Sequence, residues 1–552
     1  MSAGEGVSWR AFGWKVVDLV PGKFDWHANV LTGARVTGGD RPWWEVPDFE
    51  SGAGDIKTVW EASRFPWLLP LAVGAAAGSE DDLALAEVLL RDWVEANPPY
   101  RGPNWKCGQE ASIRVLQLAA AARLLGLVDR PPEGLLDLLR VHCRRIEPTL
   151  LYAMGQDNNH GTLEAAAMFV GGSWLQKVLN DSDGGRWFRK GRKWLEDRVA
   201  RLIASDGSFS QHSVNYHRLM LDTLCFVELW RRELGLPEFS ATFTERAAAA
   251  TQWLHAFVLR ESGDAPNLGA NDGAWLWALP VLAYRDFRPS VQFASVLFCN
   301  AYAYGEPGGP AWAYVNLFGL EHPTVRDLPR PGSEVYPEGG YAVLRAGNAV
   351  AYVRYPRFRF RPSHADALHL DFWIRGENWL RDAGTFSYNS EPKWLSYFSG
   401  TESHNTVQFD DMDQMPRIGR FLFGDWLEPL EVSPIQEEGG QVSFAAAYKD
   451  RHGHRHRREV VLGTNRLLVR DEVEGFRERA VLRWRLKPGS WREENIGLRL
   501  GSLRISVCSE VGLQVRVVKG WESRFYLQKS ELPVLEVEIK APGRIDTLVE
   551  WD

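Results

Sequence analysis

The stretch RPGSEVYPEGG (residues 330–340) separates two parts of the chain whose apolar residues recur at different intervals. It is rich in glycine and proline, which interrupt helices and strands and commonly lie between structural elements. Before it, apolar residues recur every three or four positions, and after it they tend to alternate with polar ones. The sequence therefore predicts a helical region followed by a β-sheet region, with the boundary near residues 320–340.

The region from about Asp55 to Leu320 has the periodicity of amphipathic helices. Examples are ASIRVLQLAAAARLLGLV (residues 111–128) and RLMLDTLCFVELWRREL (residues 218–234). Short breakers such as NPPYRGPN and DRPPEG separate these segments. Successive helices with short links and no strand between them predict a helical bundle or an α/α toroid, in the form of an incomplete barrel.

The region after residue 340 has the pattern of short strands. In PVLEVEIK (residues 533–540) apolar and charged residues alternate, which is typical of a half-buried strand. VVLGTNRLLVRDEVEG (residues 460–475) predicts two strands around a turn at Thr464–Asn465. Many such strands predict an antiparallel β-sandwich. We therefore expect a multidomain α+β fold with an N-terminal extension (1–54), an α/α toroid (55–325) and an antiparallel β-sandwich (326–552).

Composition limits the classes of function. A chain of 552 residues is too long for one compact core. Its formal net charge of -7 gives no overall attraction to nucleic acid or to acidic lipid. No apolar stretch is long enough to span a bilayer. The N-terminus shows no signal peptide, so we expect a cytoplasmic protein, or a periplasmic or secreted one if a signal was trimmed.

Two polar segments in the helical region are candidates for catalysis. In GQDNNHGTLEAAAMF (residues 155–169), Asn158, Asn159 and His160 lead into an apolar helical run. One Asn is explained by helix capping, but two Asn and a His exceed what a cap requires. In SDGSFSQHSVNYHRLMLDTL (residues 205–224), a turn precedes Gln211 and Tyr216 at the start of another helix. The alternative for this second segment is an ordinary loop with a half-buried tyrosine.

A third segment, in the β-sheet region, contains possible metal ligands. Histidines and aspartates recur between residues 363 and 414, and they include His364, Asp382 and His404. Imidazole nitrogens and carboxylate oxygens suit a tetrahedral zinc site, although the spacing matches no short metal motif. HGHRHRREV (residues 452–460) also contains three histidines, but an alternating polar run favours an exposed strand or loop.

Cationic residues for an anionic polymer are found in PRFRFRP (residues 356–362). Arg357, Arg359 and Arg361 have a two-residue period, so on a strand they would share one face. A solvated strand face is the equally simple alternative.

In this order, the segments resemble the heparinase II/III-like polysaccharide lyases. The resemblance covers most of the chain, from DIKTVWEASRFPWLLPLA and NWKCGQEASIRVLQLA through the NNH and NYH segments to HADALHLDFWIRGENWLRDAGT and SHNTVQFDDMDQ. It implies a lyase that cleaves a uronate-containing polysaccharide, of the glycosaminoglycan or alginate type, by β-elimination. Such a reaction must neutralise the uronate carboxylate, remove the C5 proton and protonate the departing O4.

The resemblance also implies roles for residues of this chain. Asn159 matches the amide that neutralises the carboxylate, His160 assists it or acts as base for one C5 epimer, and Tyr216 matches the tyrosine acid. His364, Asp382 and His404 match the residues that hold one divalent metal, usually zinc, in a structural role. The residues expected to bind the substrate are Asn158, Gln211, Arg357, Arg359 and Arg361. Some relatives carry a catalytic histidine two residues before the first metal histidine, where this chain has Pro362.

Two other functions are compatible with the sequence. A glycoside hydrolase would need a pair of carboxylic acids, for which Glu61, Glu110, Glu164 and Asp206 are available. A non-catalytic glycan-binding protein of polysaccharide biosynthesis is the other alternative. A pure binding protein, however, has no need of a proton donor such as Tyr216.

Overall fold

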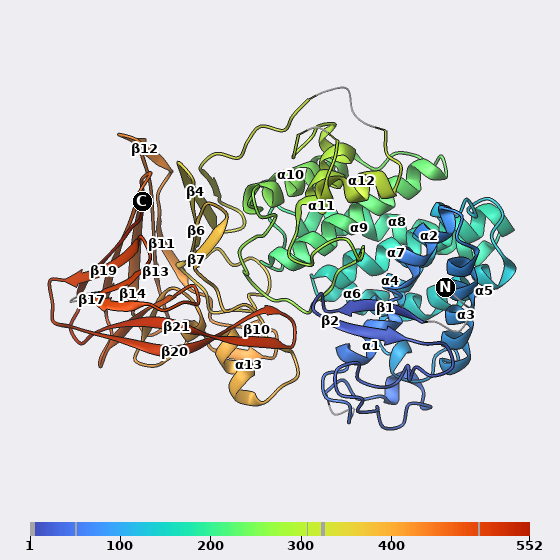
Figure 1. Cartoon of the computed structure of the whole chain (residues 1–552), viewed down its shortest axis with the longest axis horizontal. Helices are drawn as coiled ribbons and strands as arrows, with labels where there is room; N and C mark the ends of the chain where they lie inside the picture. The colour runs from blue at the N-terminus through green and yellow to red at the C-terminus, as the bar shows by residue number, and fades with distance from the viewer. Residues whose placement is uncertain (1–5, 50–51, 306, 322–325, 495–496) are drawn as a thin grey trace. The chain divides into compact units, whose positions relative to one another are not determined.

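The structure is a computed structural model that describes residues 6–49, 52–305, 307–321, 326–494 and 497–552 (Figure 1). It divides into two compact units. The first comprises Met1–Gly207, Asn215–Gln252 and Asp272–Leu328, and the second comprises Ser208–Val214, Trp253–Asn271 and Pro329–Asp552. Two short segments from the helical part of the sequence thus group with the second unit. The three-part division of the sequence stays a prediction.

The first unit is mainly helical. An antiparallel hairpin of β1 (Val7–Ala11) and β2 (Lys15–Leu19) opens it. The longer helices that follow are α3 (Glu80–Ala96), α4 (Gly108–Leu124), α5 (Glu133–Ile146), α7 (Asn159–Leu179), α8 (Ser182–Leu202), α9 (Val214–Glu233) and α10 (Ala241–Phe257). The shorter ones are α1 (Lys57–Ser63), α2 (Leu68–Ala76), α6 (Leu150–Gly155), α11 (Arg288–Ala294) and α12 (Ala313–Leu317).

Local sequence determines where α7 and α8 begin and end. The side chain of Asn158 caps α7 by accepting a hydrogen bond from a backbone N–H of the first turn (3.0 Å). Asn180 ends the helix in the left-handed conformation (φ 51°), which asparagine tolerates well. Asp181 then caps α8 by accepting from two backbone N–H groups. A two-residue link therefore turns the chain back on itself.

Glycines allow α7 and α8 to pack closely along their length. A Cβ on Gly191 of α8 would lie 2.3 Å from the backbone nitrogen of Phe169 in α7. A Cβ on Gly172 of α7 would lie 2.4 Å from the backbone nitrogen of Phe188 in α8. The residue numbers rise in one helix as they fall in the other, so the two helices are antiparallel neighbours.

The second unit consists of antiparallel sheets. One sheet has the order β11-β13-β14-β15-β22-β19-β18-β17 with β12 beside β13, a second has β20-β21-β16-β8, and a third has β3-β4-β5-β6-β7. The strands of the first sheet are β11 (Glu428–Val432), β12 (Gln436–Glu438), β13 (Gln441–Lys449), β14 (Arg455–Leu462), β15 (Arg466–Glu474), β17 (Arg492–Glu494), β18 (Gly497–Leu500), β19 (Leu503–Ser509) and β22 (Gly543–Glu550).

The other strands and the helix of this unit complete the framework around the candidate metal ligands. They are β3 (Glu334–Tyr336), β4 (Tyr341–Ala346), β5 (Ala349–Arg354), β6 (His369–Ile374), β7 (Glu377–Leu380), β8 (Val407–Phe409), β9 (Arg417–Gly419), β10 (Leu422–Phe423), β16 (Ala480–Arg485), β20 (Leu513–Phe525), β21 (Gln528–Ile539) and α13 (Pro392–Ser399).

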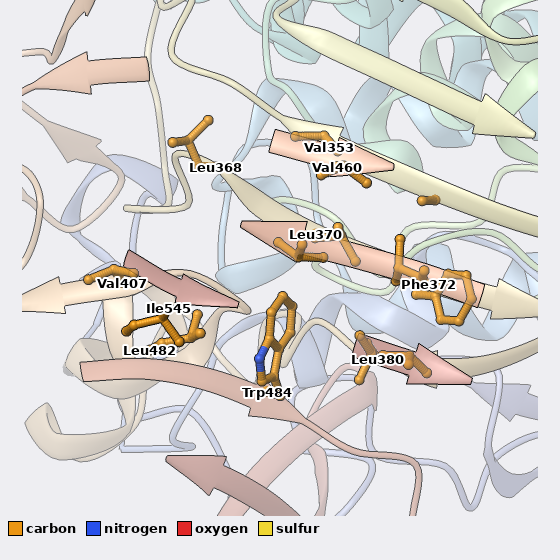
Figure 2. Close-up of a cluster of buried hydrophobic side chains, with 14 of the residues drawn as sticks. Val353, Leu368, Leu370, Phe372, Leu380, Val407, Val460, Leu482, Trp484 and Ile545 are labelled. Atoms are coloured by element: carbon orange, nitrogen blue, oxygen red, sulfur yellow. The ribbon is translucent and has the colours of Figure 1, made fainter. Parts of the chain in front are cut away.

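The core of the second unit combines side chains from all three of these sheets (Figure 2). Phe372 comes from β6, Val460 from β14 and Trp484 from β16, and each is essentially fully buried. A core filled from facing sheets is the arrangement of a β-sandwich. The predicted fold class, a helical region followed by an antiparallel β-sandwich, is confirmed. Among the described residues, no helix is both long and apolar enough to cross a membrane.

Two predictions about exposure in the sandwich are wrong. Glu536 and Glu538 of β21 are buried rather than solvated, because Arg483 and Arg479 form ion pairs with them (2.7 and 3.0 Å). His456 of β14 is also buried.

The histidines of HGHRHRREV make structural contacts within the sandwich. His454 lies 2.7 Å from a carboxylate oxygen of Asp450, and His456 lies 2.7 Å from one of Asp471. Asp471 belongs to the neighbouring strand β15, so the local alternation could not reveal its contact with His456.

Candidate active site and candidate metal centre

Helices α4 and α7 run in the same direction. Near their N-terminal ends, a Cβ on Gly108 of α4 would lie 2.7 Å from the carboxylate of Glu164 in α7. Further along both helices, Gly171 of α7 packs against Val115 of α4. The residue numbers rise together, so the first turns of α4 and α7 lie side by side.

Helix α9 follows the same direction as α4. Leu219, from its first half, lines the same small hollow as Ile113 and Gln117 of α4. At the other end, Arg123 of α4 forms an ion pair with Glu233 of α9 (2.9 Å). The N-terminal ends of α4, α7 and α9 therefore lie toward one end of the first unit, where helix dipoles favour negative charge.

Asn158 and Asn159 have different surroundings. The Oδ1 atom of Asn158 accepts the capping hydrogen bond, and its amide nitrogen donates to Gln156 (3.3 Å). Asn159 is buried, and its amide nitrogen donates a hydrogen bond to Oε1 of Gln109, in the first turn of α4. Capping thus accounts for Asn158, whereas Asn159 is held in a fixed orientation by a side chain from another helix.

His160 has a buried carboxylate beside it. Its Nδ1 atom lies 3.4 Å from Oε1 of Glu164, one helical turn further along α7. A quarter of the His160 side chain is exposed, whereas that of Glu164 is only 3% exposed. Burial raises the pKa of Glu164, while the contact with His160 lowers it in part. Glu164 is thus placed to orient the imidazole.

Tyr216 lies in the first turn of α9 and is buried, with 5% of its surface exposed. Its neighbours hold this turn in place. His217 forms a hydrogen bond with the carbonyl of Ala250 (2.8 Å), and burial lowers its pKa to about 4. Oδ1 of Asn215 accepts hydrogen bonds from Arg218 and from the hydroxyl of Tyr284 (both 2.8 Å). The phenol is therefore carried by a rigid backbone.

The other predicted substrate-binding residues lie in the second unit. Gln211 belongs to its segment Ser208–Val214. Arg357, Arg359 and Arg361 follow β5 in an irregular segment, so the predicted strand with a shared arginine face is wrong. The segment is bounded by prolines, which cannot donate to a strand ladder.

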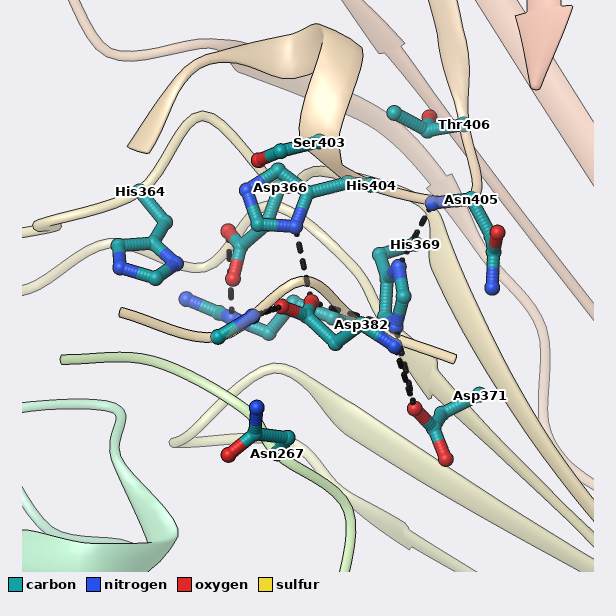
Figure 3. Close-up of polar contacts among 12 residues, drawn as sticks. Asn267, His364, Asp366, His369, Asp371, Asp382, Ser403, His404, Asn405 and Thr406 are labelled. Atoms are coloured by element: carbon teal, nitrogen blue, oxygen red, sulfur yellow. Dashed lines mark hydrogen bonds and ion pairs between the residues drawn. The ribbon is translucent and has the colours of Figure 1, made fainter. Parts of the chain in front are cut away.

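The candidate metal ligands His364, Asp382 and His404 come together (Figure 3). All three are buried, and one ligand atom from each lies within 4.8 Å of the others. His364 precedes β6, Asp382 follows β7, and His404 precedes β8. Loops from three places in the sequence thus meet at one point of the second unit.

The charges of the triad favour a neutral His364 beside a His404–Asp382 pair. Burial, followed by the proximity of His404, lowers the pKa of His364 to about 4. Burial alone would lower the pKa of His404, but Asp382, 2.8 Å from its Nδ1, raises it overall. The same histidine, with His369, outweighs burial and lowers the pKa of Asp382.

A second layer of side chains holds Asp382. His369 accepts a hydrogen bond from the backbone N–H of Asn405 through Nδ1 (2.9 Å), so its neutral ring carries the proton on Nε2, 3.4 Å from Asp382. The backbone N–H of Asp382 donates to Asp371 (3.1 Å). Such contacts resemble the outer partners that orient metal ligands.

The triad fits a divalent metal ion. Nδ1 of His364 and Nε2 of His404 are buried and lack a hydrogen-bond partner among the described residues. Buried ring nitrogens normally have partners, so two unpaired ones beside a carboxylate indicate a ligand position. Two imidazoles and one carboxylate are a donor set that zinc accepts.

Sequence reasoning missed several supporting residues. Gln109 carried no signal, because its role depends on α4 packing beside α7. Glu164 was considered only as an acid for hydrolysis, although its spacing of four from His160 places both on one helix face. His369 and Asp371 lie in the predicted run of histidines and aspartates between residues 363 and 414, but no role was assigned to either of them.

Fold and site together define a protein with a helical unit, an antiparallel sandwich and a buried His/Asp/His triad. Residues 328–531 match the family described as heparinase II/III-like, C-terminal. The predicted resemblance to the heparinase II/III-like proteins is thereby confirmed for this part of the chain.

The similarity to one curated protein agrees with the family match. The chain is 20% identical over 385 residues to a heparin-sulfate lyase of Bacteroides thetaiotaomicron, a match that covers 65% of this chain and 52% of that protein. The match therefore spans about half the length of the curated relative.

Solved structures show the same fold. The crystal structure of heparinase III has a TM-score of 0.67 at 15% identity and covers 94% of this chain and 80% of its own. The heparan sulfate lyase HepC from Pedobacter heparinus has a TM-score of 0.59 at 18% identity and covers 99% of this chain and 81% of its own. The helical unit is accordingly an α/α toroid of the type found in these proteins.

Proposed function

We propose that this protein is a polysaccharide lyase that cleaves a uronate-containing glycosaminoglycan by β-elimination. The observation that carries the proposal is that an amide and an imidazole lie in the first turn of α7 and a phenol lies in the first turn of α9, two helices that both run parallel to α4. The named activities of the relatives support it.

Asn159 would bind the uronate carboxylate. A side-chain amide has two N–H donors. One donates to Gln109, which orients the other. Hydrogen bonding to the carboxylate, with the helix N-termini nearby, lowers the free energy of the charge that develops when the C5 proton leaves.

Tyr216 would complete the elimination as general acid. The C5–H bond breaks and the proton passes to a base. The C5 electron pair forms the C4–C5 double bond as the C4–O4 bond breaks, and O4 takes a proton from the phenol of Tyr216. For one C5 epimer the base is Tyr216 itself, and for the other it is His160, whose imidazolium Glu164 stabilises.

The metal ion would have a structural role. His364, Asp382 and His404 would hold it, and when bound it would cross-link three loops of the sandwich. No step of the elimination requires it, because the residues that move protons lie in the first unit.

Hydrolysis is less compatible with the carboxylates of the first unit. Glu61 and Glu110 both form hydrogen bonds with Arg64, at 3.1 Å and 2.7 Å. The guanidinium bridges the two carboxylates. These two glutamates are therefore not placed as a hydrolytic pair.

A panel of uronate polysaccharides tests the proposal. Heparan sulfate, chondroitin, hyaluronan and alginate are incubated with the protein, and the ultraviolet absorbance of the C4–C5 double bond is followed. We expect an absorbance increase with at least one glycosaminoglycan. New reducing ends without an absorbance increase would instead identify a hydrolase.

A further inference from the structure

Exposed aromatic side chains are rare in this protein. The chain contains 25 Trp, 15 Tyr and 26 Phe, yet only four of these rings are exposed among the described residues. Three of the four, Trp44, Phe49 and Tyr152, belong to the first unit. Trp44 exposes 62% of its surface and Tyr152 exposes 75%. Large apolar rings that remain in solvent are available to a ligand or a partner.

Trp44 lies beside the start of α4. Its ring meets that of Trp43 edge-on, with the two ring centroids 5.7 Å apart. Trp43 in turn faces Arg145, whose guanidinium carbon lies 3.5 Å from the centroid of the indole ring. Arg145 donates hydrogen bonds to the carbonyl oxygens of Trp105 (2.6 Å) and Lys106 (2.5 Å), which lie just before α4 in the chain. These contacts place the tryptophan pair next to the N-terminal end of α4.

Tyr152 lies beside the start of α7. It belongs to the short helix α6, and α7 begins at Asn159 after a brief link. A Cβ on Gly161, in the first turn of α7, would lie 3.4 Å from the carbonyl oxygen of Ala153 in α6. Ala153 is buried, whereas the preceding Tyr152 is exposed. The phenol ring is therefore at the surface of the end of the first unit where Asn159 lies.

The surroundings of the two rings suit an anionic sugar. Among the described residues, Tyr152 forms no hydrogen bond, ion pair or ring contact, and the ring contact of Trp44 is with Trp43 alone. A pyranose presents a face of C–H groups, which packs flat on an aromatic ring. Arg144 is half exposed, with only a long contact to Asp183 (3.6 Å), and it favours negative groups together with the nearby helix N-termini.

We propose that Trp44 and Tyr152 bind sugar rings of an acidic polysaccharide by stacking, one beside the start of α4 and the other beside the start of α7. The identity of the polymer rests on the proposed lyase function, which the inference deepens by adding two binding residues. Neither ring takes part in a proton transfer. The two contacts would hold a long chain on the protein while Asn159 and Tyr216 act on one linkage.

Calorimetric titration tests the two contacts. Dodecasaccharides of heparan sulfate, chondroitin sulfate and hyaluronan are titrated into the Tyr216→Phe protein, in which the proposed cleavage is blocked. The variants Trp44→Ala and Tyr152→Ala remove one ring each, and Trp44→Phe and Tyr152→Phe keep an aromatic ring at the same position. Trp426→Ala is the matched control, because Trp426 is an exposed tryptophan (43%) of the second unit.

We expect each alanine variant to raise Kd at least about 5-fold for the dodecasaccharide that the parent binds best, because the stacked ring face is lost. The phenylalanine variants should retain most of the affinity, since they keep a ring and lose only a hydroxyl or an indole N–H. Trp426→Ala should bind like the parent. In the cleavage assay with Tyr216 intact, the effect of the alanine variants should fall on KM rather than on kcat.

Unchanged Kd in both alanine variants would overturn the proposal, as would a parent protein that binds none of the three dodecasaccharides. An equal loss of affinity in Trp426→Ala would also contradict it. A dimer that either alanine variant dissociates in sedimentation analysis would identify a second copy of this chain as the occupant instead. The absorbance assay decides the lyase proposal separately, because ring-dependent sugar binding without lyase activity would support the two contacts and refute only the reaction.

Discussion

Tyr216 differs from phenylalanine by one hydroxyl group, and the proposed mechanism assigns the proton transfer to that group. We expect Tyr216→Phe to lower kcat by roughly 10²-fold or more, the usual scale of general acid–base catalysis. KM should change little, because the carboxylate is bound by Asn159. Initial rates of double-bond formation over a range of substrate concentrations measure both quantities.

Tyr448→Phe is the matched control, because it also removes one tyrosine hydroxyl. Its hydroxyl accepts a hydrogen bond from Gln414 (3.1 Å) inside the sandwich, so its removal affects packing but no proposed proton transfer. Its kcat should stay near that of the parent. Near-parental kcat in Tyr216→Phe would mean that the tyrosine has a packing role and that another group protonates O4.

At the scale of elements, the close packing of α7 on α8 depends on glycine. Alanine is the better helix former by about 1 kcal/mol, so Gly191→Ala would stabilise an isolated helix. Here its Cβ would lie 2.3 Å from a backbone atom of α7, which cannot yield as a flexible side chain can. We expect Gly191→Ala to lower the free energy of unfolding by about 1–3 kcal/mol, measured by denaturant titration.

Gly155→Ala is its control. A Cβ on Gly155, at the end of α6, would meet no atom within 4 Å. This variant should be neutral or slightly stabilising. Equal effects of the two substitutions would show that helix propensity, rather than the contact between α7 and α8, determines the result.

Glu147, which directly follows α5, accepts hydrogen bonds from Arg186 and Trp187 of α8. The stability that these bonds contribute should depend on pH. Burial raises the pKa of Glu147, but hydrogen bonds from Arg186 and Trp187 outweigh it and lower the pKa to about 2. A lowered folded-state pKa adds stability above the unfolded value of 4.5, and this stability is lost as the pH falls toward about 2.

We therefore expect Glu147→Gln to lower Tm at pH 7 and to have a shrinking effect below about pH 4.5. The exposed Glu133, which follows Pro132 at the start of α5, supplies the control Glu133→Gln. The Tm of Glu133→Gln should differ little from that of the parent, both at pH 7 and below about pH 4.5. A Glu147→Gln difference that is constant with pH would contradict the ion-pair explanation.

At the scale of the molecule, the candidate metal ion would join three loops of the second unit. We expect elemental analysis of protein purified without chelator to find about one divalent ion per chain. Binding to the folded state alone stabilises it by about 4 kcal/mol when the free metal concentration is 1,000 times Kd. Chelation, or His404→Ala, should therefore lower Tm and, with it, activity.

His452→Ala controls for the loss of an imidazole, because His452 is exposed and its ring contacts Arg451 rather than the triad. The His452→Ala protein should retain the bound metal, and its Tm should equal that of the parent. Protein that contains no stoichiometric metal, or His404→Ala that retains it, would refute the metal centre.

The sequence by itself determined the features that depend on neighbouring residues. Apolar spacing identified the helices, and the strand pair around Thr464–Asn465 follows from a turn between two apolar runs. Asn158 was expected to bind substrate, but helix capping by one of the two asparagines was the alternative, and the sequence could offer it because capping needs only the next turn of the same helix. The triad of His364, Asp382 and His404 was found through the family resemblance rather than from spacing, which carried no metal motif.

Only the tertiary structure decided the features that depend on distant partners. Glu536 is buried because Arg483 from another strand compensates its charge, and Asn159 is oriented because α4 brings Gln109 beside α7. Electrostatic and packing free energies depend on distance in space, and one sequence records only distance along the chain.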